Sequence, residues 1–312
     1  MAIEYVVLMT VEGETAPAPP FAAGAGRALS VHLPAADAKA NLASLVSALM
    51  PGRVLAAGEL RLREQTLFAA LACRGFAIHA RVPKRLRSLL PERAAALEPG
   101  AAPSLAAPCL VWIHDEGGGE RRLDVPEEIA GRSARCAFVS LPSKAGDIAR
   151  PRFAAASFSF AVAAAGPLSL LDVLPTLVES RAGALPLGDG FDLGGHPIPA
   201  DRVLIAEDWR RGLLAATQGD ATLVARIGRS ALPYFLERLR FRLGLCRTGG
   251  ADDPAALVAR AGELEPIPVA ETGRLDAGRR ERLREALRAH LAGYASSADE
   301  EVLGRLRDLG YL

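Results

Sequence analysis

Cysteine pairs, net charge and long apolar runs are all scarce in this sequence. The four cysteines lie far apart and form neither a CxxC pair nor a Cys/His pattern with the spacing of zinc ligands. Their mostly apolar surroundings are typical of buried free thiols, which fits a reducing compartment. A formal net charge of +1 provides no field that would hold nucleic acid or an anionic membrane. The short basic runs Lys84–Arg87 and Arg279–Arg282 are interrupted by apolar or acidic residues and indicate solvated helix faces, so we expect no nucleic-acid partner.

A targeting segment and a membrane span are missing as well. The first residues, MAIEY, lack a basic region followed by an apolar core and a cleavage site. The longest weakly polar stretch, Phe153–Leu171, is rich in Ala and Ser and contains a Gly-Pro pair, so no run has the length and apolar character of a bilayer span. The sequence therefore predicts a cytoplasmic protein.

The patterns that are present predict an α/β protein. Hydrophobic residues make up 50% of the 312 residues, enough for one large domain or two smaller ones. Continuous apolar runs predict strands that are buried on both faces over Tyr5–Val11, Pro108–His114 and Ala134–Ser140. Helical spacing predicts a helix that ends at Gly75 and an amphipathic helix over Lys84–Leu97.

The character of the chain changes near residue 210. Arg202–Glu207 is predicted to be the last strand of the core. The segments Leu213–Thr217 and Ala221–Ile227 flank Gln-Gly-Asp, which predicts a β-hairpin. Leu275–Tyr294 carries a leucine stripe with arginine and glutamate opposite, as in an amphipathic helix. These patterns divide the chain into an α/β core, residues 1–210, and a C-terminal subdomain, residues 211–312.

Four segments resemble sulfatases of the alkaline-phosphatase superfamily. They are Ser44–Arg53, Thr66–Phe76, Leu168–Glu179 and Leu306–Leu312. The third, LSLLDVLPTLVE, is similar to a run that recurs in these enzymes, and the last, LRDLGYL, is similar to the ending of many bacterial members. The resemblance keeps the order of elements over most of the chain. It implies a mixed sheet sandwiched by helices, with a small C-terminal antiparallel sheet and terminal helices.

The residues that would perform sulfatase chemistry are absent at the matching positions. The resemblance places Ala38 at the nucleophile, Leu42 at its arginine partner, and Leu141 and Pro142 at an Asp-His metal pair. At the first metal-binding aspartate it places Glu12, whose carboxylate could still ligate Ca²⁺ or Mg²⁺. A second register puts the Asp-His motif at Asp115-Glu116 instead and leaves the strand before Leu141 without a counterpart.

Acidic residues and one histidine nevertheless follow two of the predicted strands. The candidate catalytic residues are Glu12, His114, Asp115 and Glu116, and the candidate metal ligands are Glu12, Glu14 and Asp115. The competing interpretation is that the carboxylates are solvated turn residues and that the histidine is packed at a strand end.

Two functions compete on these observations. The first is a sulfatase-like pseudoenzyme that has lost ester hydrolysis, needs no cofactor and binds a partner protein or ligand. The second is an active hydrolase of sulfate or phosphate esters with a relocated acidic site and bound Ca²⁺ or Mg²⁺, which requires its acidic residues to converge. A purely structural subunit is a third possibility. A related active sulfatase would suit the first hypothesis as partner, and a homo-oligomer is possible.

Overall fold

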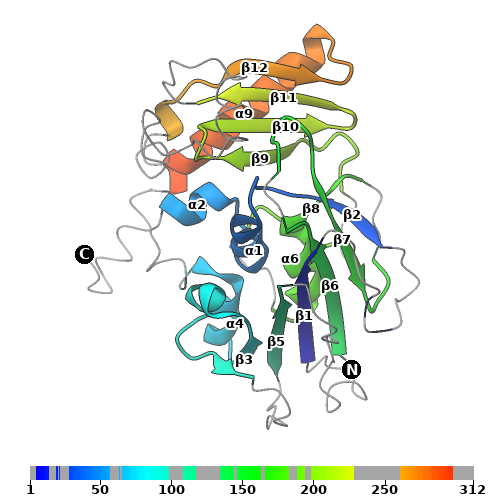
Figure 1. Ribbon diagram of the computed structural model, residues 1–312, viewed down its shortest axis with the longest axis vertical. Helices are drawn as coiled ribbons and strands as arrows, with labels where there is room; N and C mark the ends of the chain where they lie inside the picture. Colours follow the sequence, from blue (N-terminus) through cyan, green and yellow to red (C-terminus); the bar gives the residue numbers. More distant parts are fainter. Residues whose placement is uncertain are drawn as a thin grey trace. The chain divides into compact units, whose positions relative to one another are not determined.

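The computed structural model (Figure 1) describes residues 5–13, 19, 21, 28–56, 63, 65–97, 108–116, 134–143, 146–162, 166–182, 188–193, 198–227 and 261–297. Contacts between residues divide the chain into two compact units. The first unit comprises Met1–Gly146 and Arg152–Arg202, and the second comprises Asp147–Pro151 and Val203–Leu312. The predicted site residue Glu14 and the segment Leu306–Leu312 lie outside the described residues.

The first unit is built on a mixed sheet. In its described part the eight strands have the order β4-β3-β5-β1-β6-β7-β2-β8. Strand β1 runs parallel to both of its neighbours, β5 and β6, whereas β7 runs antiparallel to β6 and β2. The bounds are β1 Tyr5–Glu12, β2 Leu29–His32, β3 Ala77–Arg81, β4 Ala95–Ala96, β5 Cys109–Asp115, β6 Ala134–Leu141, β7 Phe153–Phe158 and β8 Leu168–Ser169.

Helices pack on one face of this sheet. Every residue of β1 is buried, as a central strand with both faces covered requires. Leu8 and Trp112 belong to the larger apolar cluster, which also contains residues of α1, α4 and α6, whereas Met9 and Ile113 face a second cluster on the other side. The helical elements of this unit are α1 Ala38–Ser47, α2 Pro51–Ala56, α4 Leu67–Cys73, the 3₁₀ helices η1 Lys84–Leu89 and η2 Leu170–Asp172, and α6 Val173–Ala182.

Local sequence signals set the ends of these helices. The Thr66 hydroxyl accepts from the Ala69 N–H at 3.1 Å and caps α4, and Gly75 follows that helix at a φ of 87°. Ser169 and Asp172 form a capping box in front of α6. The helix predicted over Lys84–Leu97 is wrong in type and extent, because η1 occupies its first residues and β4 lies near its end.

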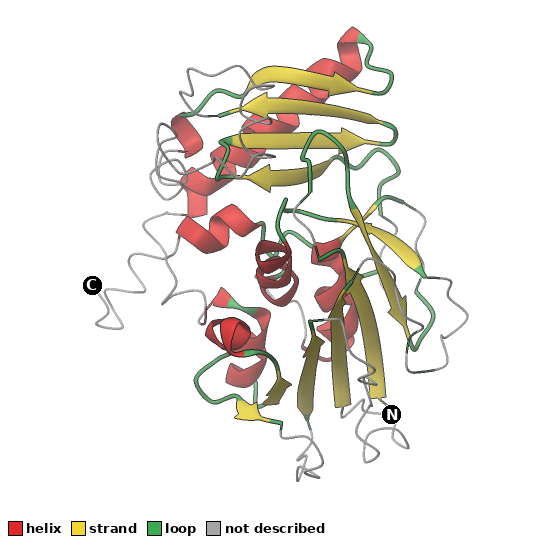
Figure 2. Ribbon diagram, in the orientation of Figure 1, coloured by secondary structure: helices red, strands yellow, loops and turns green. Residues whose placement is uncertain are grey.

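The second unit holds a separate antiparallel sheet with the order β12-β11-β10-β9 (Figure 2). The hairpin is confirmed, since Gln218 pairs with Ala221 around a turn in which Gly219 has a φ of 59°. The leucine stripe is confirmed too, because Leu283, Leu287, Leu291 and Tyr294 of helix α9 are buried. The bounds are β9 Leu204–Asp208, β10 Leu213–Gln218, β11 Ala221–Arg226, η3 Ala261–Glu263, β12 Ile267–Thr272 and α9 Ala277–Ser297.

Strand β9 corrects one prediction. The sequence predicts that Arg202–Glu207 is the last strand of the core sheet, but β9 pairs with β10 in the second sheet. An apolar run shows that a strand is buried and does not show which sheet buries it. The predicted domain boundary after residue 210 stays a prediction, while the fold class, a mixed α/β sheet with a separate antiparallel sheet, is confirmed. Over the described residues, no helix is both long and apolar enough to cross a membrane.

Candidate functional site

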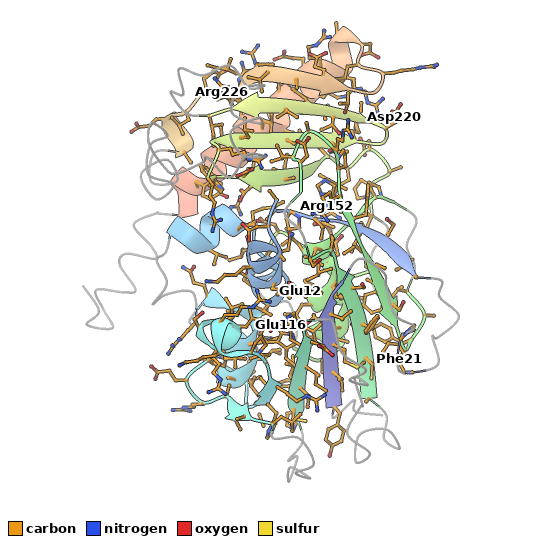
Figure 3. All side chains as sticks on the ribbon, in the orientation of Figure 1. Glu12, Phe21, Glu116, Arg152, Asp220 and Arg226 are labelled. Carbon is orange, nitrogen blue, oxygen red and sulfur yellow. The ribbon has the colours of Figure 1, made fainter. Side chains whose placement is uncertain are left out.

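Four polar side chains meet where β1 and β5 end. Glu12 is the last residue of β1, His114 is the penultimate residue of β5, and Glu116 follows β5 directly. Arg85, on η1, reaches both carboxylates. Figure 3 shows Glu12 and Glu116 close together in the middle of the first unit. The carboxyl ends of parallel strands are where α/β sheets place their ligands, so this cluster is the candidate functional site.

The strand register explains which side chains converge. β1 and β5 are parallel, and Thr10 is directly opposite His114. Side chains two residues apart in a strand share a face, so Glu12 points to the same side of the sheet as Thr10 and His114. Asp115 is opposite Val11 and points to the other face. The structure therefore brings Glu12 and His114 together and separates Asp115 from them.

Arg85 joins the two strand ends electrostatically. Its Nη2 donates to Oε1 of Glu12 and its Nε donates to Oε1 of Glu116, both at 2.7 Å. The side chain of Glu12 is only 8% exposed, whereas those of Arg85 and Glu116 are 41% and 53% exposed. The pair with Glu12 is thus the better shielded of the two, and the pair with Glu116 lies at the surface, where ion pairs contribute little.

Two buried polar side chains, Thr10 and Trp112, hold the ring of His114 on its Nδ1 side. Its Nδ1 lies 2.8 Å from Oγ1 of Thr10, and the indole N–H of Trp112 donates to the same Oγ1 at 3.0 Å. On the other side of the ring, Nε2 lies 3.4 Å from Oε1 of Glu12 and makes no hydrogen bond within the described part of the chain. The Thr10 hydroxyl can donate to Nδ1, which places the remaining ring proton on Nε2, toward the Glu12 carboxylate.

The pKa values show how the charges balance. Burial alone would raise the pKa of Glu12, but His114 and Arg85 oppose it, and the net effect lowers the pKa below its usual value. Burial likewise opposes the charged form of Arg85, yet Glu116 and Glu12 raise its pKa further. Both groups are therefore charged at neutral pH, and the guanidinium compensates the buried carboxylate.

Thr10, His114 and Glu12 have the composition of a hydroxyl-histidine-carboxylate triad, but their arrangement does not provide a nucleophile. Thr10 is fully buried, and its hydroxyl already bonds His114 and the Trp112 indole. A nucleophile must reach its substrate, and this hydroxyl cannot. Thr10 instead fixes the orientation of the imidazole ring.

The residues present do not fit the divalent cation that the resemblance to sulfatases implies. Leu141 is buried in the apolar core, and neither it nor Pro142 offers a ligand atom. The Glu12 oxygen that a cation would need accepts from Arg85. Throughout the described ranges, no group of three His, Cys, Asp or Glu side chains is arranged to hold a metal ion.

The position matched to the nucleophile lies at the start of α1. Ala38 is the first helical residue, and Oδ1 of Asp37 caps the helix by accepting from the Ala40 N–H at 2.8 Å. Asn41 is buried and closes the preceding loop, because its amide donates to the Ala35 carbonyl at 3.1 Å and accepts from the Ala35 N–H at 2.9 Å. Leu42, matched to the arginine partner, is fully buried in the core. Asp37, Asn41 and Leu42 therefore cap the helix, close the loop and fill the core, respectively.

Sequence reasoning missed Arg85, Thr10 and Trp112. The sequence predicts a solvated helix face for Arg85, and nothing in the local pattern connects it with a glutamate 73 positions away. One available signal was charge complementarity between the basic run around Arg85 and the acidic strand ends. A second was strand alternation, which already requires that neighbours such as His114 and Asp115 point to opposite faces.

Comparisons with known proteins give little beyond the fold. No protein-family model matches the chain, and no curated protein matches it. Among solved structures, the crystal structure of Ps i-CgsB in complex with k-i-k-neocarrahexaose is similar, with a TM-score of 0.43 and 10% sequence identity over 72% of this chain and 84% of that chain. The chain's own two sheets, one mixed and one antiparallel, agree with the fold class that the sequence resemblance implied.

Proposed function

We propose that this chain is a sulfatase-like protein without ester hydrolase activity, which acts by binding a partner protein or ligand. The observation that carries the proposal is the start of α1, where Ala38 occupies the position matched to the nucleophile. A methyl group cannot attack an ester, and the side chains of the first turn of α1 include no hydroxyl or thiol. The next side chains, Lys39 and Ala40, offer neither group.

The cap of α1 supports the same proposal. A helix N-terminus attracts anions because its first N–H groups are free and the helix dipole is positive there. In this chain the carboxylate of Asp37 already accepts from the Ala40 N–H. A sulfate or phosphate group that approached this end would meet the negative charge of the Asp37 side chain. The helix end is therefore poorly suited to hold an anionic ester.

Two of the other positions matched to sulfatase chemistry are occupied by core residues. Leu42 and Leu141 are fully buried and pack in the larger apolar cluster of the first unit. Charge that develops on a transferring sulfuryl group needs cations or donors close by, and these two side chains provide neither. The two leucines add apolar contacts to the core, so they stabilise the fold and do not serve catalysis.

A second candidate function, metal-dependent hydrolysis of a sulfate or phosphate ester, is favoured by one observation. Glu12, His114 and Glu116 do lie together at the carboxyl ends of two parallel strands. With Ca²⁺ or Mg²⁺ they would form the relocated acidic site. Arg85 weighs against this function because its guanidinium already donates a hydrogen bond to each of the two carboxylates. Glu14, the remaining acidic candidate, lies outside the described residues.

The test is turnover of 4-nitrophenyl sulfate and 4-nitrophenyl phosphate, with EDTA and with millimolar Ca²⁺, Mg²⁺, Mn²⁺ or Zn²⁺. We expect no turnover above that of the heat-denatured protein under any of these conditions. The Glu12→Gln variant is the control for a contaminating enzyme, because its activity should then equal that of the wild type. Metal-dependent turnover that falls at least tenfold in Glu12→Gln would overturn the proposal and establish the hydrolase.

A further inference from the structure

We infer that the guanidinium of Arg85 takes the place of a divalent cation, and that its removal turns Glu12, His114 and Glu116 into a cation-binding site. The inference concerns binding alone and does not depend on whether the protein hydrolyses esters. Its starting point is the disagreement between the cation that the sequence resemblance implies and the arginine found beside Glu12.

The contacts of Arg85 bring two carboxylate oxygens to one side of a single positive group. The Nε–H and the neighbouring Nη2–H of an arginine point in the same direction along one edge of the guanidinium. Glu116 accepts from the first and Glu12 from the second, each at 2.7 Å. The two carboxylates therefore share one positive group along a single edge of the guanidinium. A divalent cation that replaced this group could take one oxygen from each of them.

His114 offers a third donor atom beside Glu12. Its side chain is fully buried, and Nε2 faces Oε1 of Glu12 at 3.4 Å without a hydrogen-bond partner among the residues described. The Thr10 hydroxyl can serve Nδ1 either as donor or as acceptor, so the tautomer with a free lone pair on Nε2 is accessible. A ring nitrogen held in this way, with its other nitrogen bonded to a supporting group, is the usual form of a metal-binding histidine.

The charges favour a cation once the arginine is gone. Without Arg85, the shielded carboxylate of Glu12 would keep Glu116 as a like-charged neighbour and lose its charge partner. Two carboxylates and an imidazole are a mixed oxygen and nitrogen set, which suits Mn²⁺ and Zn²⁺ better than Ca²⁺. In the wild type the guanidinium excludes these ions. Unlike a bound ion, it is part of η1, so it also links that helix to the two carboxylates at the ends of β1 and β5.

The experiment compares metal-free wild type, Arg85→Ala and Arg87→Ala. Arg87 is a matched control, since it is an exposed arginine on the same 3₁₀ helix. Melting temperatures are measured in EDTA and in 1 mM Mn²⁺ or Zn²⁺, and native mass spectrometry counts the bound ions. We expect Arg85→Ala to bind one ion and to gain about 5 °C, whereas the wild type and Arg87→Ala bind none. The double variant Arg85→Ala/Glu12→Gln should lose this gain.

Two results would overturn the inference. One is an equal gain and an equal ion count in the wild type, which would mean that Arg85 does not exclude the ion. The other is an Arg85→Ala protein that binds no ion. If Arg85→Ala does not fold, Arg85→Met keeps the aliphatic stem and removes only the charged end, and the same criteria apply to it. Turnover plays no part in these measurements, so their failure is distinguishable from failure of the proposed function.

Discussion

His290 holds its Nε2 2.6 Å from Oε1 of Glu207, and both side chains are buried in the second unit. The Tyr294 hydroxyl donates to the same oxygen, and the indole N–H of Trp209 donates to Oε2 at 2.9 Å. Glu207 comes from β9, whereas His290 and Tyr294 come from α9. One carboxylate therefore joins the helix to the sheet.

We predict that Glu207→Ala destabilises the second unit strongly. The substitution leaves three buried donors without their acceptor, and such a loss costs about 2 to 5 kcal/mol of unfolding free energy. Urea unfolding followed by circular dichroism measures the loss, and faster hydrogen exchange along α9 locates it. Glu271→Ala is the control, because its pair with Arg280 lies at the surface and should matter little. Equal unfolding midpoints for the two variants would contradict the prediction.

The elements that the sequence predicted best are those whose pattern is local. The apolar runs of β1, β5 and β6, the hairpin around Gly219 and the stripe of α9 each depend on neighbours in sequence, and each is confirmed. The misplaced strand β9 and the misjudged segment after Lys84 depend instead on partners far along the chain. An apolar strand can join either sheet, and leucines three residues apart, such as Leu86 and Leu89, suit a 3₁₀ helix as well as an α-helix.

The candidate site shows the same division. The sequence predicted that polar residues lie at the strand ends. It also predicted Ala38 at the position matched to the nucleophile. It did not predict the role of Arg85, because an ion pair between η1 and β1 exists only once the sheet register has brought them together. The opposite orientations of His114 and Asp115 follow from strand alternation alone, which places Asp115 on the other face of the sheet from Glu12.

Asp172 is a buried charged residue within the segment Leu168–Glu179, which resembles sulfatases in sequence. It is fully buried and accepts from the backbone N–H groups of Ser169 at 2.8 Å and Phe191 at 2.9 Å. Arg202 adds two further bonds to its oxygens, at 2.7 and 3.0 Å. The carboxylate thus joins the start of α6 to two later loops of the first unit.

We predict that Asp172→Ala costs about 3 to 5 kcal/mol of unfolding free energy, because it leaves Arg202 nearly buried and without its charge partner. Urea unfolding of the variant and the wild type under identical conditions measures the difference. Glu92→Ala provides the comparison, since Glu92 lies exposed in a turn of the same unit. A loss no larger than that of Glu92→Ala would show that Asp172 does not hold these loops together.

His32 should make the first unit sensitive to acid. It is buried at the end of β2, with its ring edge-on to Phe153, and burial, aided by the charge of Arg202, lowers its pKa from 6.5 to about 4. Between these two values the unfolded chain binds a proton that the folded chain does not, so stability is complete above pH 6.5 and falls as the pH drops toward 4. The loss from this residue reaches about 3 kcal/mol.

We predict that His32→Gln flattens the dependence of unfolding free energy on pH between 4 and 6.5. The measurement is a series of urea unfolding curves across that range, compared as slopes so that a uniform loss of stability does not interfere. His79→Gln serves as the control, because His79 is only partly buried and its pKa is lowered by that burial alone. A slope that stays unchanged in His32→Gln would show that this histidine does not titrate as proposed.

The cap of α1 offers a test of why the helix end should reject anionic esters. Asp37→Ser keeps a side-chain oxygen that can accept from the Ala40 N–H, but it removes the negative charge. Asp37→Ala removes both the cap and the charge, at a cost of about 1 kcal/mol.

If the charge is what repels anions, sulfate should raise the melting temperature of Asp37→Ser more than that of the wild type, at equal ionic strength set with chloride. The shift should be saturable, as binding at one site requires, and it should also occur in Asp37→Ala from a lower starting temperature. Identical sulfate responses in all three proteins would mean that the helix end does not select against anions through Asp37, and the proposed lack of hydrolase activity would then rest on Ala38 and not on the helix cap.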